Sequence, residues 1–112
     1  MKNLRNRVNL IGNLGADPEI KKFDTGKKFA KLLLATNGSY KNGEGKKVED
    51  TQWHNLIVWE GLADVAEKYL KKGKEIAVEG RLNYRSYEDS DGNTRYVTEI
   101  IVSDLLMLGK NS

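Results

Sequence analysis

Cysteine is absent from this chain of 112 residues, and histidine occurs only once. Without thiols, neither a disulfide framework nor a thiolate metal site can form, and nothing indicates an oxidising compartment. No apolar run resembles a signal peptide or approaches the length of a membrane span. A Walker lysine motif and a paired-histidine metal motif are also missing. The sequence therefore predicts a cytoplasmic protein without a cofactor or a bound metal, and not an enzyme.

The net charge of the chain does not by itself indicate or exclude a class of binding partner. A formal net charge of +3, from 19 basic and 16 acidic residues, is too small to imply a polyanionic partner by itself. Basic residues gather in short clusters along the sequence, but a solvated surface produces such clusters too. The length fits one domain, residues 1–112, with its folded part expected at about 5–109.

Alternating apolar and polar residues predict a half-buried strand from Arg7 to Leu14. Gly12 lies inside this strand, where glycine indicates a bulge, a bend or a second backbone passing close by. The run from Phe29 to Thr36 is more continuously apolar. We interpret it as a second strand, although its periodicity also allows a short buried helix.

Both tryptophans and the histidine fall in the segment 51–59. If this segment is a strand, Trp53 and Trp59 point to one face, whereas His54, Leu56 and Val58 point to the other. The second set has the character of a core row, which leaves the two indoles on the opposite face. Flat rings on an outer sheet face suit stacking on nucleic-acid bases, since every base has a π-face. The alternative is that both tryptophans belong to the core, where aromatic side chains commonly dominate.

Residues 37–50 are rich in glycine, asparagine, lysine and glutamate. This composition predicts a flexible loop or a hairpin tip, in which Tyr40 is the lone aromatic residue. A tyrosine in such a loop has no obvious core to join. A binding function is therefore favoured for it more than for an aromatic residue inside a strand.

After the second tryptophan, apolar residues recur at helical spacing and predict one amphipathic helix. Its apolar stripe comprises Leu62, Val65, Ala66, Tyr69 and Leu70. Lys71 and Lys72 are expected in the last turn, where positive charge complements the helix dipole. Gly73 can take the left-handed conformation that ends a helix.

Strand alternation returns in residues 75–87, and a turn at 89–93 followed by a strand at 95–102 predicts a hairpin. The row expected inside comprises Ile76, Val78, Gly80, Leu82 and Tyr84. The outer row ends with Arg81, Asn83, Arg85 and Tyr87. Two guanidinium groups beside an aromatic ring fit phosphate pairing combined with base stacking. A solvated face with cross-strand ion pairs, for example to Glu99, explains the same row equally well.

The expected elements follow one another as three strands, a helix and two strands, joined by glycine-rich turns. This order predicts an all-β protein with the OB-fold, a five-stranded Greek-key barrel whose one α-helix lies between strands 3 and 4. Ligands of that fold usually bind to strands 2 and 3 and to the loops 1-2 and 4-5. Trp53 and Trp59 fall on strand 3, Tyr40 in the loop between strands 2 and 3, and Tyr87 near the tip of the 4-5 hairpin. Their placement favours the outward, base-stacking interpretation.

The order of short motifs along the chain resembles that of the bacterial-type single-stranded DNA-binding proteins. The matching segments are NRV at 6–8, LIGNLG at 10–15, DPE at 17–19, LAT at 34–36, QWH at 52–54, the helical segment 62–73, VEGRL at 78–82 and MLG at 107–109. The resemblance covers nearly the whole chain. Its specificity comes from the order and spacing of the motifs together.

The resemblance implies a homotetramer, a dimer of dimers, that binds single-stranded DNA without sequence specificity in DNA replication, recombination and repair. In a bacterium it would act in the cytoplasm at the nucleoid. The four base-stacking positions of the family hold Tyr40, Trp53, Trp59 and Tyr87 here. The family often has tryptophan at the positions of both tyrosines and phenylalanine at that of Trp59.

Basic family positions near the DNA backbone correspond to Arg7, Lys72 and Arg85, and Arg81 joins them through its place in the outer strand row. Asn55 stands at a further position that is often basic in the family. Leu10, Gly12 and His54 are expected at contacts between subunits. The alternative for the histidine is an ordinary polar residue at the end of a strand.

The acidic tail of the family does not follow Gly109, so recruitment of repair and replication proteins through such a tail is not expected. An OB-fold module that docks proteins or binds RNA is the alternative function. Protein docking would lack the steep salt dependence of nucleic-acid binding. An enzyme is the weaker alternative, because a single histidine among scattered carboxylates is more often structural than catalytic.

Overall fold

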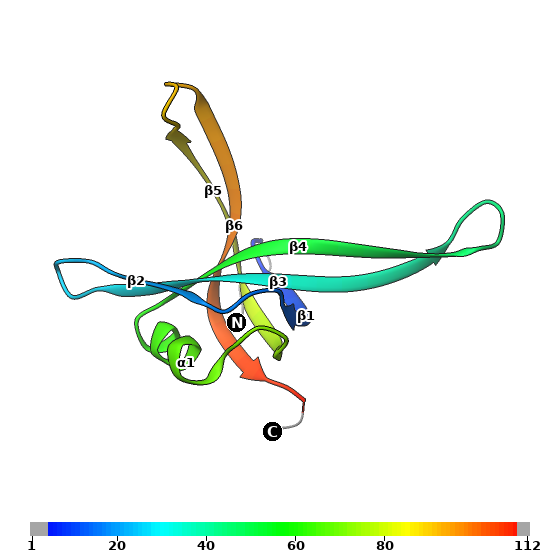
Figure 1. Ribbon diagram of the computed structural model, residues 1–112, viewed down its shortest axis with the longest axis horizontal. Coiled ribbons are helices and arrows are strands. Elements are labelled where there is room, and N and C mark those ends of the chain that lie inside the picture. Colours follow the sequence, from blue (N-terminus) through cyan, green and yellow to red (C-terminus); the bar gives the residue numbers. More distant parts are fainter. Residues whose placement is uncertain (1–4, 110–112) are drawn as a thin grey trace.

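The computed structural model describes residues 5–109 and contains six strands and one helix in this part of the chain. The elements are β1 (Val8–Leu14), β2 (Glu19–Lys22), β3 (Lys28–Lys41), β4 (Lys47–Trp59), α1 (Gly61–Tyr69), β5 (Glu75–Glu88) and β6 (Thr94–Met107). The five longer strands form the predicted Greek-key barrel, with α1 between β4 and β5 (Figure 1). The short strand β2, which the sequence did not predict, pairs with β3.

Two short pairings close the barrel. At one seam the end of β1 pairs antiparallel with β3, and at the other β4 runs parallel to β6. The paired residues are Asn13 with Ala35, Leu14 with Leu34, Leu56 with Ile100, and Ile57 with Ile101. Every other pairing between neighbouring strands is antiparallel. The segment 29–36 is therefore a strand, and the alternative of a buried helix is wrong.

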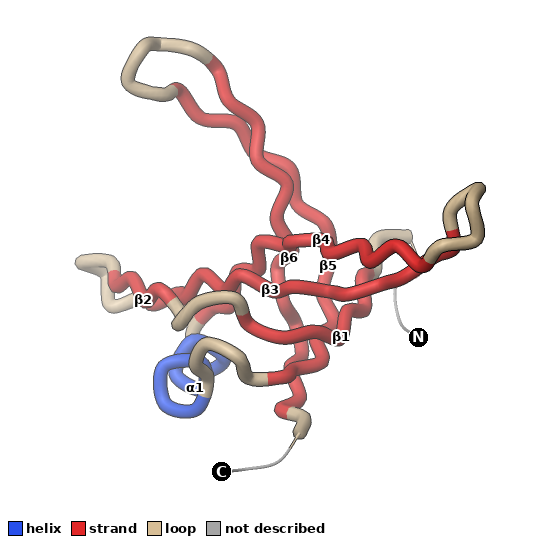
Figure 2. Tube along the Cα trace, turned by 45° about the vertical axis from the view of Figure 1, so that its right-hand side comes forward, coloured by secondary structure: helices blue, strands red, loops and turns tan. Residues whose placement is uncertain are grey.

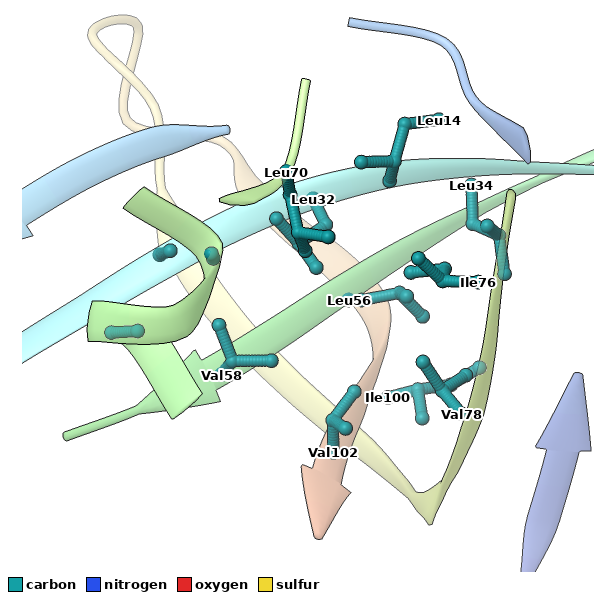
Figure 3. Packing of buried hydrophobic residues seen from close by; sticks show 13 residues of the cluster. Leu14, Leu32, Leu34, Leu56, Val58, Leu70, Ile76, Val78, Ile100 and Val102 are labelled. Atoms are coloured by element: carbon teal, nitrogen blue, oxygen red, sulfur yellow. The ribbon is translucent and has the colours of Figure 1, made fainter. Parts of the chain in front are cut away.

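Leucine, isoleucine and valine side chains from all five barrel strands fill the interior (Figure 3). The side chains of Leu34, Leu56, Val58 and Ile76 are fully buried. Burying one such side chain contributes about 1.5–3 kcal/mol to the free energy of unfolding. The alternation in β1 and β4 thus separates the core row from the outer row, except that Ile57, in the outer row of β4, is only 6% exposed.

Gly12 is required by the way the barrel closes. A Cβ atom at this position would lie 2.1 Å from the carbonyl oxygen of Ala35, which is closer than any real contact. Of the three explanations predicted for this glycine, a second backbone passing close by is therefore confirmed. The close approach lies within one chain, so Gly12 is explained without a subunit contact.

Two long hairpins, β3–β4 and β5–β6, extend beyond the barrel, and we call them the arms; the shorter β2–β3 hairpin also projects (Figures 1 and 2). The β3–β4 arm comprises residues 37–51, and the β5–β6 arm comprises residues 83–99. The predicted loop at 37–50 is therefore wrong in extent, because strand pairing continues to Lys41 and Lys47 and leaves only a short turn. Tyr84, which was expected inside, is exposed because the β5–β6 arm has no core beside it.

The helix is shorter and rotated relative to the prediction. It ends at Tyr69, and the next residue, Leu70, is already extended. Ala63 and Ala66 are completely buried, whereas Tyr69 is 59% exposed. Small alanine side chains allow α1 to lie close to the barrel, which turns the bulky tyrosine outward.

The lysines that follow the helix also differ from the prediction. Lys71 and Lys72 lie beyond α1 and not in its last turn. Gly73 does adopt a positive φ of 92°, but within the turn that leads into β5. Across residues 5–109, no helix has the length and apolar character needed to cross a membrane.

Candidate nucleic-acid interface

The two indoles lie on the outer face of β4. Trp53 is 57% exposed and Trp59 is 39% exposed, whereas Leu56 and Val58 on the other face are completely buried. The core interpretation of the tryptophans is therefore wrong. The two tryptophans are six positions apart along β4, a length of about 20 Å at the rise of a β-strand.

The ring of Trp53 is supported from below by the loop between β1 and β2. A Cβ atom on Gly15 would come within 2.4 Å of Cζ3 of this indole, so the ring lies directly against the glycine backbone. The Gly15 N–H donates a hydrogen bond of 2.9 Å to the carbonyl oxygen of Leu33, which fixes the loop to β3. Only a glycine leaves room for the ring in this position.

Lys72 lies in a segment that is attached to the same loop. The backbone N–H of Lys72 donates a 2.8 Å hydrogen bond to Oδ1 of Asp17, and the N–H of Gly73 donates one of 2.8 Å to the carbonyl oxygen of Leu14. The Lys72 side chain is exposed. The fold therefore places a cation on a segment bonded to the loop that supports Trp53.

Trp59 belongs to a cluster of three rings that we call the aromatic triad: Phe23, Phe29 and Trp59. Phe29 lies directly opposite Trp59 in the β3–β4 pairing, with ring centroids 5.0 Å apart. Phe23, just after β2, lies 5.4 Å from Phe29 and 6.2 Å from Trp59. Neither phenylalanine stands out in the sequence alone, because their proximity to Trp59 depends on the strand register.

A groove of about 370 Å³ separates the outer face of β3 and β4 from the base of the β5–β6 arm. Its polar lining comprises Lys31, Asn55, Arg85, Tyr87 and Glu99. Asn55 lies in the outer row of β4 between the two indoles, two residues from Trp53 and four from Trp59. The groove therefore opens on the outer row of β4 between the two indoles, and Arg85 and Tyr87 line it from a distant strand.

Within this groove, Arg85 is engaged in two ways. Its Nε atom donates a 3.1 Å hydrogen bond to Oε1 of Glu99, a carboxylate that is only 6% exposed, and Asn83 donates to the same oxygen. The guanidinium also lies 5.9 Å from the centroid of the Tyr87 ring. The predicted cross-strand ion pair to Glu99 is therefore present, and it fixes Arg85 beside an exposed aromatic ring.

Arg7 and Arg81 lie elsewhere. Both line a separate hollow of about 270 Å³ together with Glu79, away from the two indoles. Nη2 of Arg7 lies 2.6 Å from Oε1 of Glu79, so its charge is balanced within the chain. The structure therefore does not bring all the predicted phosphate ligands into one site.

Tyr40 is exposed but occupies the other face of the β3–β4 arm. It pairs with Val48, and the regular register of the two strands places this pair on the same face as His54. Nε2 of His54 is hydrogen-bonded to Oγ1 of Thr36 at 2.9 Å. Tyr40 and the indole row therefore lie on opposite faces of one ribbon.

Lys28, at the start of β3, points away from the face that carries the two indoles. Its ammonium group donates hydrogen bonds to Asp64, at 2.7 Å, and to Glu67 on α1. These bonds lower the pKa of both carboxyl groups and raise the pKa of Lys28. At the tip of the β5–β6 arm, hydrogen bonds from Arg95 and from the backbone N–H of Asn93 lower the pKa of Asp89.

The closed Greek-key barrel, with its helix between β4 and β5 and its exposed rings along β4, defines a protein of the OB-fold class. Residues 5–108 match the single-strand binding protein family. The chain belongs to that family.

Individual relatives agree with this assignment. The chain is 43% identical over 105 residues to single-stranded DNA-binding protein 1 of Chlorobaculum tepidum, covering 93% of this chain and 65% of the relative. It is also 43% identical over 106 residues to single-stranded DNA-binding protein 1 of Xylella fastidiosa, covering 94% of this chain and 78% of the relative. The chain thus spans slightly less than two thirds of the length of the Chlorobaculum protein.

Solved structures match over nearly the whole fold. A Plasmodium falciparum SSB in complex with ssDNA superimposes with a TM-score of 0.88 at 32% identity, covering 97% of this chain and 99% of that one. A deletion mutant of the Thermus aquaticus single-stranded DNA-binding protein matches with a TM-score of 0.82 at 28% identity, covering 93% of this chain and 50% of that one.

Proposed function

We propose that this protein binds single-stranded DNA without sequence preference and protects it during replication, recombination and repair. The observation that carries the proposal is the outward display of Trp53 and Trp59 beside a groove lined by Lys31, Arg85 and Tyr87. The names of the relatives and the DNA complex of the Plasmodium protein support it. The protein acts by binding alone, in the cytoplasm.

Two physical terms supply the affinity. Base stacking on exposed aromatic rings contributes about 1–3 kcal/mol per base. Cations such as Lys72, and Arg81 in the separate hollow, neutralise phosphates and release counterions. Single strands are preferred because the bases of a duplex are already stacked on each other and cannot reach the indoles.

A fluorescence titration with oligo-dT at several salt concentrations tests the proposal, with a duplex of equal length as the control. We expect strong quenching of tryptophan emission by oligo-dT and weak quenching by the duplex. The logarithm of the affinity should fall with the logarithm of the salt concentration by about 0.7 for each neutralised phosphate. Unchanged emission at saturation would remove Trp53 and Trp59 from the DNA-binding face.

The same titration separates the alternatives. A protein-docking module would show no binding of oligo-dT with a steep salt dependence. An RNA-binding module would bind oligo-rU more tightly than oligo-dT under identical conditions, because only RNA offers the 2′-hydroxyl group.

The protein also assembles as a homotetramer in our proposal. An exposed apolar row crosses β1, β5 and β6, where Ile11 pairs with Ala77 and Ala77 pairs with Leu106. Ile11 and Leu106 are each 62% exposed, which is unusual for large apolar residues on adjacent strands. A second copy of the chain, presenting the same row, would cover them; Leu10 and His54 remain predicted at subunit contacts.

Sedimentation at micromolar concentration tests the assembly. We expect the mass of a tetramer for the wild type and a smaller species for Ile11→Lys, because a charge in the apolar row cannot be buried without a partner. A monomer for the wild type under these conditions would refute the assembly and leave the DNA-binding proposal intact.

A further inference from the structure

The aromatic triad extends the indole row onto a third strand. Phe23 follows β2 directly, in a turn where its N–H donates to the carbonyl oxygen of Lys27 at 2.8 Å and its own carbonyl oxygen accepts from the N–H of Gly26 at 2.9 Å. The positive φ of 89° at Gly26 closes this turn. The position of the Phe23 ring is therefore set by a hydrogen-bonded turn and by two neighbouring rings.

The three rings have the orientation of a binding surface. The planes of Phe23 and Trp59 are inclined by only 22°, and those of Phe23 and Phe29 by 25°. Phe23 is 49% exposed at the outer end of the cluster, whereas Phe29 between the strands is half-buried. One ring thus anchors the cluster and the other two present aromatic surface to solvent.

Cations accompany the rings on the same face. Lys21 lies directly opposite Phe29 in the β2–β3 pairing, and Lys31 lies two residues further along β3, on the face that carries Phe29. Lys28 between them points to the other face, where Asp64 and Glu67 hold it. Of the other two, Lys21 has its Nζ atom 3.6 Å from Oε1 of Glu19 in a loose surface ion pair, and Lys31 lines the groove. Both charges lie beside the aromatic triad, where a phosphate backbone passing over it would meet them.

We propose that Phe23 is a further base-stacking residue, so that the strand of DNA continues from Trp53 past Trp59 onto the β2–β3 hairpin. This inference rests on the proposed function and adds to it one nucleotide site, with a nucleobase on the Phe23 ring and phosphates near Lys21 and Lys31. The stacking contact with Phe29 keeps the ring in place before DNA arrives, which reduces the ordering cost of binding.

A single-tryptophan reporter tests the inference. In the double variant Trp53→Phe, Trp59→Phe, both positions keep an aromatic ring but lose the indole signal. Adding Phe23→Trp then places the only indole at the proposed site. Binding of fluorescein-labelled oligo-dT is followed independently by anisotropy. We expect the emission of Trp at this site to be quenched as the oligonucleotide saturates the protein.

Tyr69→Trp in the same double variant is the comparison, because Tyr69 is an exposed aromatic residue on α1 outside the triad, in the hollow that Lys71 and Lys72 also line. Its emission should change much less than that of the indole at position 23. Saturation by anisotropy without quenching at position 23, or equal quenching at position 69, would overturn the inference while leaving the proposed function standing. Absence of any binding of oligo-dT to the wild-type protein would overturn both the inference and the proposed function.

A substitution in the otherwise native protein gives a second readout. Phe23→Leu keeps an apolar side chain but removes the ring, and we expect a roughly five- to tenfold loss of affinity for oligo-dT, the lower part of the range for one stacked base. Phe23→Tyr should retain the wild-type affinity. The opposite result has two parts: Phe23→Leu changes the tryptophan emission of the protein without DNA, and Phe23→Tyr loses as much affinity for oligo-dT as Phe23→Leu does. Phe23 would then support Trp59 and would not bind a base.

Discussion

The indole of Trp53 lies against the backbone of Gly15, on the loop between β1 and β2. This relationship links two parts of the sequence that are 38 residues apart and makes the position of a surface ring depend on the absence of a side chain elsewhere. It therefore offers a way to move the ring without changing the ring itself.

Gly15→Ala should displace Trp53 and weaken binding of oligo-dT by about 1–3 kcal/mol, the contribution of one stacked base. The added methyl group would meet the indole at 2.4 Å, and an exposed ring can move aside. We therefore expect little change in thermal stability. Gly61→Ala is the control, since a Cβ atom there meets nothing within 4 Å. Equal binding by both variants, measured by anisotropy, would show that the observed ring position is not the binding one.

Lys72→Gln should reduce the magnitude of the salt slope for oligo-dT by about 0.7, because one phosphate contact is lost. The Lys72 side chain is exposed and its segment is hydrogen-bonded to Asp17 near Trp53. Lys28→Gln removes the same charge where it is already held by two carboxylates of α1 and should leave the slope unchanged. A slope that changes equally in both variants would indicate a general effect of net charge.

Glu99→Gln should raise the affinity for oligo-dT at low salt and steepen the salt slope by up to about 0.7, since Arg85 is released from its ion pair. Thermal unfolding should also show a loss of stability of about 1 kcal/mol from the weakened hydrogen bonds. Glu60→Gln, at an exposed position before α1, controls for net charge. Lower affinity in Glu99→Gln would instead show that the ion pair holds Arg85 in its binding position.

The hydrogen bonds between Lys28 and its two carboxylate partners should make stability depend on pH at both extremes. The pKa values of Asp64 and Glu67 are lowered from 3.8 and 4.5, so their contribution is present above these values and is lost as the pH falls through the lower, folded-state values. The pKa of Lys28 is raised from 10.5, so its contribution is present below 10.5 and is lost as the pH rises through the higher value.

Melting temperatures of the wild type and of Lys28→Gln, measured across this pH range, test that dependence. The difference between the two proteins should be largest near neutral pH and should shrink in acid and in strong alkali. A difference that is constant across the range would mean that Lys28 contributes through packing of its hydrocarbon chain alone.

Sequence alone predicted those parts of the fold in which one face of a strand meets the core. In β4 the burial of Leu56 and Val58 and the exposure of Trp53 follow directly from alternation. In the arms the same rule has no physical basis, because both faces are solvated. Alternation therefore places Tyr84 on the wrong side, and the glycine-rich composition around Tyr40 predicts a loop or hairpin tip over residues that mostly pair as strand.

The candidate site shows the same limit. The outward tryptophans were predicted, but their neighbours come from elsewhere in the sequence. Phe29 meets Trp59 only through the β3–β4 register, and Gly15 meets Trp53 only once the barrel closes. Composition groups Lys28 and Lys31 in one basic cluster. Alternation along β3 sends these two lysines to opposite faces, so that Lys28 is held by α1 and Lys31 lines the groove.

The two arms have a consequence for how such a protein can change over time. Because the arms lie outside the core shown in Figure 3, a longer turn or a different ring at their tips leaves the packing of Leu34, Leu56 and Ile76 untouched. Substitutions at the tips can thus alter the contact area and the affinity for a ligand with little effect on folding. Proteins descended from one barrel can therefore differ in affinity and in the length of ligand that they contact while they keep the same fold.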